Sequence, residues 1–190
     1  MTKLVAIVGG IGSGKSVVAR MVAAMGYDVY DCDSRAKALM DTDDSIKRRI
    51  ADEVCAEAIV GSEIDRRRLS AVVFNNLRKL ERLNSIVHES VRSDLRAWVS
   101  KSRGSVAFVE TAILYQSGLD KMVDEVWEVT ALEEERVRRV MLRNGMTAEE
   151  VRSRIKAQDD YVAERKHERV FAVVNDGATA VLPRVLELLS

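Results

Sequence analysis

The sequence of 190 residues contains one proline, two cysteines and few aromatic side chains (5%), and its charges of either sign are equal in number. A single proline leaves no room for a proline-rich linker, and we see no internal repeat. Cys32 and Cys55 form neither a metal-binding pattern nor a disulfide framework, so they fit a reduced, cytosolic setting. Because 30 basic and 30 acidic side chains cancel, bulk charge indicates neither nucleic acid nor a membrane as the main partner.

Long hydrophobic runs are also absent. No apolar run approaches the roughly 20 residues that a membrane helix needs. The N-terminus enters an apolar run at residue 4 and shows no signal peptide. We therefore expect a cytoplasmic protein. The apolar content of 47% suffices for one sizeable core, and the length suggests a single domain.

Residues 9–16 read Gly-Gly-Ile-Gly-Ser-Gly-Lys-Ser and fit the phosphate-binding pattern G-x-x-x-x-G-K-[ST]. An apolar run at residues 4–8 predicts a buried parallel strand before the pattern, and apolar residues recur at helical spacing after it. These flanks argue against the alternative, a chance glycine-rich turn. Glycines let backbone N–H groups turn toward a polyphosphate, and the helix N-terminus favours an anion. The sequence thus predicts a nucleoside triphosphate site at Gly10, Ile11, Gly12, Ser13, Gly14, Lys15 and Ser16.

Two of these side chains have expected chemical roles. Lys15 is expected to reach the β- and γ-phosphates, and the Ser16 hydroxyl to bind Mg²⁺. A predicted strand at residues 106–109 ends in Glu110, which loosely resembles the second Mg²⁺-side carboxylate of P-loop enzymes.

A pair of carboxylates follows another predicted strand, residues 27–30. If Asp31 and Asp33 extend that strand, its period of two places both on one side of its carboxyl end, where ligands of open α/β sheets bind. One interpretation assigns Mg²⁺ binding to one carboxylate and a general-base role to the other. The alternative is a turn in which Asp33 or Ser34 caps the next helix. We favour the functional interpretation because a P-loop lies one strand–helix unit upstream.

Residues 34–103 are mostly helical by period, with a short extended piece at residues 58–60. A basic run that starts with Arg66 lies at the start of a predicted helix, where the helix dipole favours negative charge. The run therefore indicates either an anion site or a solvated charged face. His88 and Arg92 lie four residues apart on a long amphipathic helix. The residues alone favour a packing role for His88.

Arginines gather on a helix predicted after a strand at residues 125–129. Arg136, Arg139 and Arg143 share one face at spacings of three and four. One interpretation makes these arginines ion-pair partners of the preceding glutamates. The other places them on a lid that closes on the transferring phosphate, with Gly145 as its hinge. A capping box at residues 147–150 predicts a further helix to about residue 169.

A last strand at residues 170–174 and a helix ending near residue 189 complete the pattern. Five apolar strands alternate with helices, which predicts a three-layer α/β fold with a five-stranded parallel sheet.

These motifs together resemble the dephospho-CoA kinase family over nearly the whole chain. Residues 9–16 have the P-loop of the family, and Asp31-Cys32-Asp33 stands for its Asp-Ala-Asp. The further matches are Ile64-Asp65-Arg66, Leu83-Asn84 with His88, the basic Arg92, the lid arginines Arg139 and Arg143, the R-x-x-x-Q of Arg154 and Gln158, and the adenine-side turn at Asn175. The chain departs from the family pattern at Glu89, where proline is usual, and in residues 112–116.

The resemblance implies a P-loop kinase with a core of about residues 1–33 and 104–190, a helical acceptor-binding insert of about 34–103, and a lid of about 136–147. It implies ATP-dependent phosphorylation of the ribose 3′-hydroxyl of dephospho-CoA, the last step of coenzyme A biosynthesis, without nucleic acid or a membrane. We expect a monomer, although an oligomer is also compatible with the sequence.

The resemblance also assigns roles to individual residues. Asp33, Lys15 and Arg139 are expected to be catalytic. Arg143 and Asn175 join the P-loop in binding ATP, and Ser16 with Asp31 holds Mg²⁺. The acceptor is expected to contact Asp33, Arg66, His88 and Arg92.

Two other functions stay open at this point. One is another small-molecule kinase of this fold, acting on a nucleoside monophosphate, shikimate or gluconate. The other is a non-enzymatic P-loop switch, which would need an Asn-Lys-x-Asp motif; Asn175-Asp176-Gly177 lacks the lysine.

Overall fold

The computed structural model describes residues 2–159 and 166–190, and the chain divides into two compact units. The core unit comprises Met1–Tyr30 and Ser102–Ser190, and the helical unit comprises Asp31–Lys101. The predicted single domain, with its insert at residues 34–103 and its lid at 136–147, stays a prediction. No helix within the described ranges is both long and apolar enough to span a lipid bilayer.

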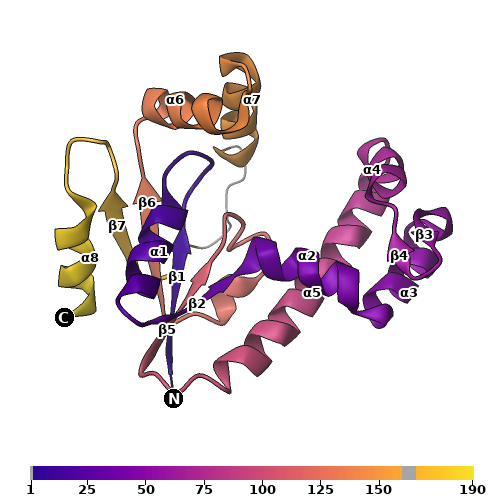
Figure 1. Cartoon of the computed structure of the whole chain (residues 1–190), viewed down its shortest axis with the longest axis horizontal. Coiled ribbons are helices and arrows are strands. Elements are labelled where there is room, and N and C mark those ends of the chain that lie inside the picture. Colours follow the sequence, from indigo (N-terminus) through magenta and orange to yellow (C-terminus); the bar gives the residue numbers. More distant parts are fainter. Residues whose placement is uncertain (1, 160–165) are drawn as a thin grey trace. The chain divides into compact units, whose positions relative to one another are not determined.

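The predicted five-stranded sheet is confirmed, in the order β2-β5-β1-β6-β7 (Figure 1). Parallel pairing joins β1 to β5, β1 to β6 and β6 to β7. The strands are β1 (Lys3–Val8), β2 (Asp28–Asp31), β5 (Val106–Glu110), β6 (Glu125–Thr130) and β7 (Val170–Val174). Because β1 is the middle strand, the P-loop that follows it lies at the centre of the carboxyl edge of the sheet.

Apolar side chains of neighbouring strands pack together and form the core of this unit. Ile7 and Phe108 are fully buried, and the Phe108 ring packs edge-on against Trp127, with centroids 5.0 Å apart. Two helices, α1 (Lys15–Ala24) and α8 (Val181–Leu189), contribute Val22 and Val185 to the same core. Burying such side chains removes them from water, which is the main stabilising contribution to the fold.

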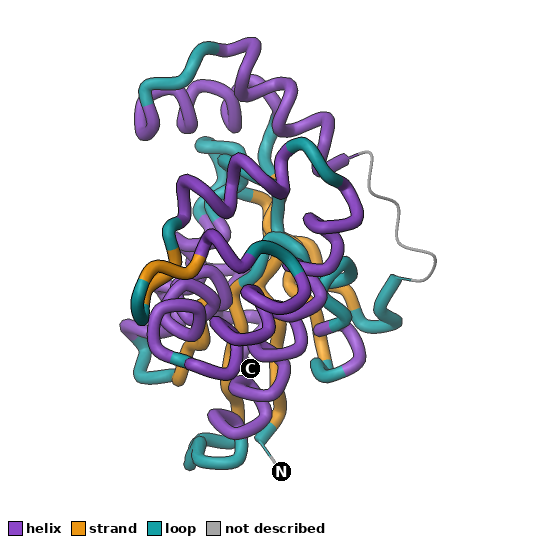
Figure 2. The backbone as a smooth tube through the Cα atoms, turned by 90° about the vertical axis from the view of Figure 1, so that its right-hand side faces the viewer, coloured by secondary structure: helices purple, strands orange, loops and turns teal. Residues whose placement is uncertain are grey.

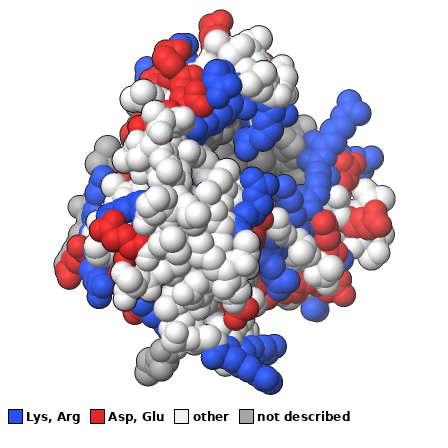
Figure 3. All heavy atoms as spheres, turned by 60° about the vertical axis from the view of Figure 1, so that its left-hand side comes forward, with Lys and Arg blue, Asp and Glu red and all other residues white. Residues whose placement is uncertain are grey.

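The helices α1 and α8 also expose apolar side chains. Val17 on α1 and Leu182 and Leu186 on α8 are 37%, 44% and 51% exposed. Figure 3 presents the side of the core unit that carries these helices, and uncharged side chains cover the middle of that view.

The arginine-rich segment forms α6 (Glu133–Asn144), which ends at Gly145 in a left-handed conformation. The predicted capping box is present: the Thr147 N–H donates to Glu150 Oε2 over 2.8 Å, and the Glu150 N–H donates to Thr147 Oγ1 over 3.3 Å. It starts α7, described as Ala148–Asp159.

The prediction that this helix continues to about residue 169 is wrong for residues 166–169, which are not helical. Hydrogen bonds of His167 fix this segment instead. Its Nε2 bonds to the carbonyl oxygen of Val123, and its Nδ1 accepts from the Arg169 N–H. Residues 160–165 lie outside the described part of the chain. Charged side chains continue a helical pattern across this region, so the sequence alone did not show the end of the helix.

The helical unit has a core of its own, in which Ile46, Ile50, Leu69 and Ile86 pack together. Figure 2 shows that most of this unit is helix. Its helices are α2 (Cys32–Thr42), α3 (Asp44–Glu53), α4 (Arg66–Phe74) and α5 (Leu77–Val99). The predicted extended piece is β3 (Ile59–Val60), and it pairs antiparallel with β4 (Glu63–Ile64), which the sequence analysis missed.

Candidate active site

The P-loop connects β1 to α1 through a tight turn. The Ser13 N–H donates to the Gly10 carbonyl oxygen over 3.1 Å, and Gly14 precedes α1 with φ of 95°, a left-handed conformation that favours glycine. A Cβ at Gly14 would clash with the side-chain amide of Asn175. No side chain among the described residues caps α1, so its N-terminus, which directly follows the loop, suits an anion.

A serine, a lysine and a glutamate meet at the end of this loop. The Ser16 hydroxyl donates to Glu110 Oε1 over 2.5 Å, and Lys15 Nζ lies 3.8 Å from the same oxygen. Glu110 ends β5, directly opposite Ile7 of β1, so the pairing of the two strands brings the carboxylate to the P-loop. Hydroxyl and carboxylate oxygens are the ligands that Mg²⁺ prefers, so these donors fit that ion.

Arg139 also contacts the loop. Its Nε donates to Glu135 Oε1 over 2.9 Å, and its Nη1 lies 3.4 Å from the carbonyl oxygens of both Gly12 and Ser13. Hydrogen bonds and charge from Arg138, and then from Arg139, lower the pKa of Glu135 to about 2. Arg139 therefore faces the phosphate-binding loop with its orientation set by an ionised carboxylate.

The structure does not bring Arg143 to this loop. Arg143 is exposed, and its Nε donates to Asn144 Oδ1 over 2.8 Å. Its expected role in ATP binding stays a prediction.

Asn175, by contrast, contacts the loop directly. Its Nδ2 donates to the Ser13 carbonyl oxygen over 2.8 Å, and its Oδ1 lies 3.4 Å from Arg139 Nη2. Asn175 follows β7, so this contact joins an outer strand of the sheet to the P-loop.

Two further contacts with the loop were not predicted. Arg136 Nε donates to the Ile11 carbonyl oxygen over 3.0 Å, and Gln158 Oε1 accepts from the Ile11 N–H over 2.8 Å. The only sequence signals were the shared helix face for Arg136 and the R-x-x-x-Q motif for Gln158. Neither signal indicated a P-loop contact.

The paired aspartates belong to the helical unit, and one expectation about them is wrong. Asp31 and Asp33 do not extend one strand, because β2 ends at Asp31 and α2 begins at Cys32. The cap is Asp31, not Asp33 or Ser34: its Oδ1 accepts from the N–H groups of Asp33 and Ser34, over 3.0 and 3.2 Å. Hydrogen bonds to the free N–H groups of a helix start explain the early turn. Asp33 is exposed in the first turn of α2.

The expected acceptor-binding residues also lie in the helical unit. Arg66 starts α4 and donates from Nη2 to Asp41 Oδ1 over 2.6 Å. His88 and Arg92 share a face of α5. Burial, and secondly the charge of Arg92, lower the pKa of His88, so the neutral imidazole is favoured at neutral pH.

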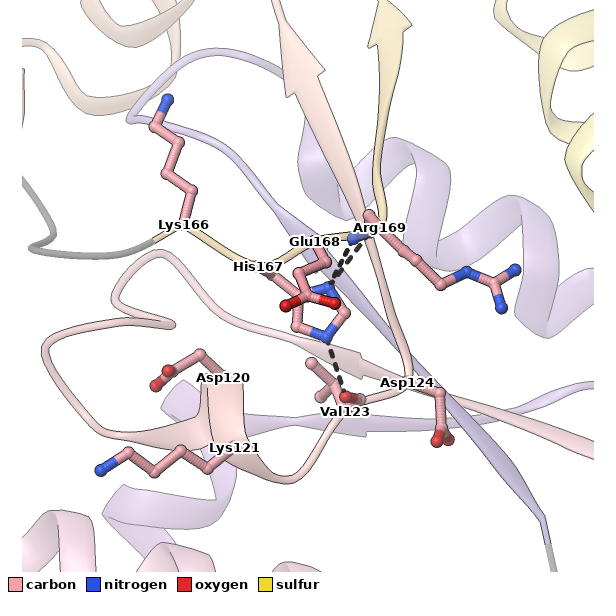
Figure 4. A pocket seen from close by; sticks show the side chains of 8 residues that line it. All are labelled: Asp120, Lys121, Val123, Asp124, Lys166, His167, Glu168 and Arg169. Atoms are coloured by element: carbon pink, nitrogen blue, oxygen red, sulfur yellow. Dashed lines mark hydrogen bonds between the residues drawn. The ribbon is translucent and has the colours of Figure 1, made fainter.

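A cavity of about 570 Å³ lies away from the P-loop (Figure 4). Its lining residues precede β6 and β7, so it belongs to the amino edge of the sheet. Figure 4 shows that the charged ends of Lys121, Lys166 and Arg169 point in different directions. They do not converge as the groups that bind one substrate do.

The fold and this site define the chain as a P-loop kinase, because a buried parallel strand leads into a phosphate-binding loop that arginines from a later helix contact. The sequence model of the dephospho-CoA kinase family matches residues 3–180. The chain therefore belongs to the dephospho-CoA kinase family.

Individual relatives agree with this assignment. A dephospho-CoA kinase of Porphyromonas gingivalis is 34% identical over 185 residues, covering 97% of this chain and 92% of the relative. One of Thermus thermophilus is 36% identical, with 97% and 88% covered. A crystal structure from Thermus thermophilus superposes with a TM-score of 0.79 at 34% identity, covering 99% of this chain and 96% of that one. A shikimate kinase from Bacteroides thetaiotaomicron, 14% identical with a TM-score of 0.55 and 98% of each chain covered, shows the shared fold alone.

Proposed function

We infer that the protein phosphorylates dephospho-CoA with ATP, giving CoA and ADP as the last step of coenzyme A biosynthesis. The observation that carries this function is the P-loop with Lys15, Ser16 and Glu110 at the carboxyl edge of the sheet, in a chain of the dephospho-CoA kinase family. The loop supplies the phosphate chemistry, and the family supplies the identity of the acceptor. We further propose that the enzyme acts in the cytoplasm as a monomer.

In the proposed mechanism, the P-loop amides and Lys15 hold the β- and γ-phosphates. The acceptor 3′-oxygen attacks the γ-phosphorus, the bond to the β–γ bridging oxygen breaks, and ADP leaves. Asp33 accepts the proton of the attacking hydroxyl, and Arg139 neutralises charge on the transferring group.

The metal and the acceptor complete this proposal. Ser16, with Glu110 or Asp31, would hold Mg²⁺, which neutralises charge on the phosphate oxygens when it is bound. Arg66, His88 and Arg92 would bind the acceptor, while Asn175 and Arg143 would bind the nucleotide.

A coupled assay of ADP release tests the function, with dephospho-CoA compared against AMP, shikimate and gluconate. We expect dephospho-CoA to give the highest kcat/KM, and mass spectrometry to identify CoA as the product. Lys15→Ala is the control and should lower kcat/KM at least about 10²-fold, since it removes a charge that stabilises the transition state. A higher kcat/KM with one of the other acceptors would overturn the assignment.

A further inference from the structure

Two side chains hold both backbone groups of one P-loop residue. Gln158 accepts from the Ile11 N–H and Arg136 donates to the Ile11 carbonyl oxygen, over 2.8 and 3.0 Å. Arg136 lies in the first turns of α6, and Gln158 lies at the described end of α7. Ile11 itself is in the turn between Gly10 and Ser13, so the contact falls at the tip of the loop.

This arrangement sets the direction of neighbouring peptide groups. A peptide group is planar and trans, so its C=O and N–H point in opposite directions. The Ile11 carbonyl points toward Arg136, and the Gly12 N–H in the same peptide group therefore points away from it. Gln158 and the Ser13 N–H hold the two ends of the preceding peptide group, between Gly10 and Ile11.

Glycines on either side of Ile11 leave room for Arg136 and Gln158 to approach the loop backbone. A Cβ on Gly10 would lie 3.3 Å from Gln158 Oε1 and would clash with the Arg136 guanidinium. A Cβ on Gly12, where φ is 79°, would lie 2.5 Å from the Arg136 carbonyl oxygen. Glycine permits this close approach, but it also leaves the backbone with many accessible conformations. The two side chains remove that freedom.

We propose that Gln158 is a positioning residue for nucleotide binding. Its bond to the Ile11 N–H keeps the peptide groups at the loop tip in one orientation, with the Gly12 N–H available to the polyphosphate. The Ile11 side chain packs against the cluster that includes Val140, Val151 and Ile155, so α6 and α7 hold the residue through apolar contacts as well. The position of α7 and the shape of the P-loop are thereby coupled.

Amide hydrogen exchange of the ligand-free full chain, measured by NMR, tests this coupling without any assumption about the reaction. Gln158→Met keeps a long flexible side chain but removes the acceptor oxygen, whereas Gln158→Glu keeps an acceptor. We expect the Ile11 amide to exchange about 2- to 13-fold faster in Gln158→Met, the factor expected for loss of its hydrogen bond, and near the wild-type rate in Gln158→Glu. Lys156→Met, at an exposed position of the same helix, controls for the substitution itself.

A second experiment, which rests on the proposed nucleotide site, measures the affinity for ATP by equilibrium titration in the absence of an acceptor. Gln158→Met should weaken ATP binding about 2- to 13-fold with an unchanged Tm, and Gln158→Glu should restore most of the affinity. In turnover assays the KM for ATP should change more than kcat. Unchanged Ile11 exchange in Gln158→Met would overturn the proposal, as would equal loss of affinity in both variants with a lowered Tm. Failure of dephospho-CoA as a substrate would leave both experiments intact.

Discussion

The hydroxyl of Ser16 donates to Glu110 over 2.5 Å, which joins the P-loop to the end of the neighbouring strand β5. Both oxygens of Asp31, the expected metal ligand, accept hydrogen bonds from the start of α2. If Glu110 is the carboxylate on the metal side, Glu110→Gln should raise the Mg²⁺ concentration for half-maximal activity about tenfold or more. Asp31→Asn should change it little, since asparagine also caps helices well. The reverse pattern in Mg²⁺ titrations would assign the metal to Asp31.

The general-base role of Asp33 can be tested without disturbing the helix. Because Asp31 is the cap of α2, replacement of Asp33 leaves the cap intact. Asp33→Asn should keep ATP affinity and Tm and lower kcat about 10²- to 10⁴-fold, because an amide cannot take the proton. Single-turnover rates across a Mg²⁺ titration provide the measurement. A rate near wild type, or one restored by excess Mg²⁺, would rule the role out.

Arg139 is expected to act mainly on the transition state. Its guanidinium contacts the P-loop carbonyls and is oriented by Glu135. Arg139→Ala should lower kcat about 10²-fold and raise the KM for ATP much less, because charge on the transferring group is greatest in the transition state. Arg138→Ala, which removes the exposed arginine on the same glutamate, is the matched control. Equal changes in kcat and KM would instead assign Arg139 to ground-state binding.

A buried carboxylate gives the core unit an acid-sensitive contribution to stability. Glu125 is 3% exposed, and burial would raise its pKa, but hydrogen bonds from Trp127 and Lys3 lower it overall. Stability from this group is present above its unfolded pKa of roughly 4.3 and is lost as pH falls toward the lower folded value. The free energy of unfolding from urea titrations should thus fall less in Glu125→Gln than in wild type as the pH is lowered from 7 to about 3, below the unfolded pKa.

Exposed Glu81→Gln controls for the loss of one negative charge in that experiment. An identical pH dependence in Glu125→Gln and in the wild type would contradict the assignment.

The sequence predicted the parts of the fold that depend on local pattern. Apolar runs identified all five core strands, and Thr147 with Glu150 identified a helix start, because period and capping chemistry are local. The order of the strands was not predicted, since it depends on which buried faces pack together. Asp33 was misplaced because the strand pattern was continued past Asp31, the residue that caps α2. The contacts of Arg136 and Gln158 with Ile11 depend on tertiary structure, which no spacing rule encodes.

The middle position of β1 has a consequence for synthesis of the chain. This strand pairs Lys3 with Val106 on one side and Val5 with Glu125 on the other, so its partners leave the ribosome long after it does. The helical unit, contained within Asp31–Lys101, is complete before either partner strand exists. Because non-local pairings form slowly and domains fold as units during translation, β1 emerges as an unpaired apolar segment. We therefore expect β1 to remain without its sheet partners until β5 and β6 have been made.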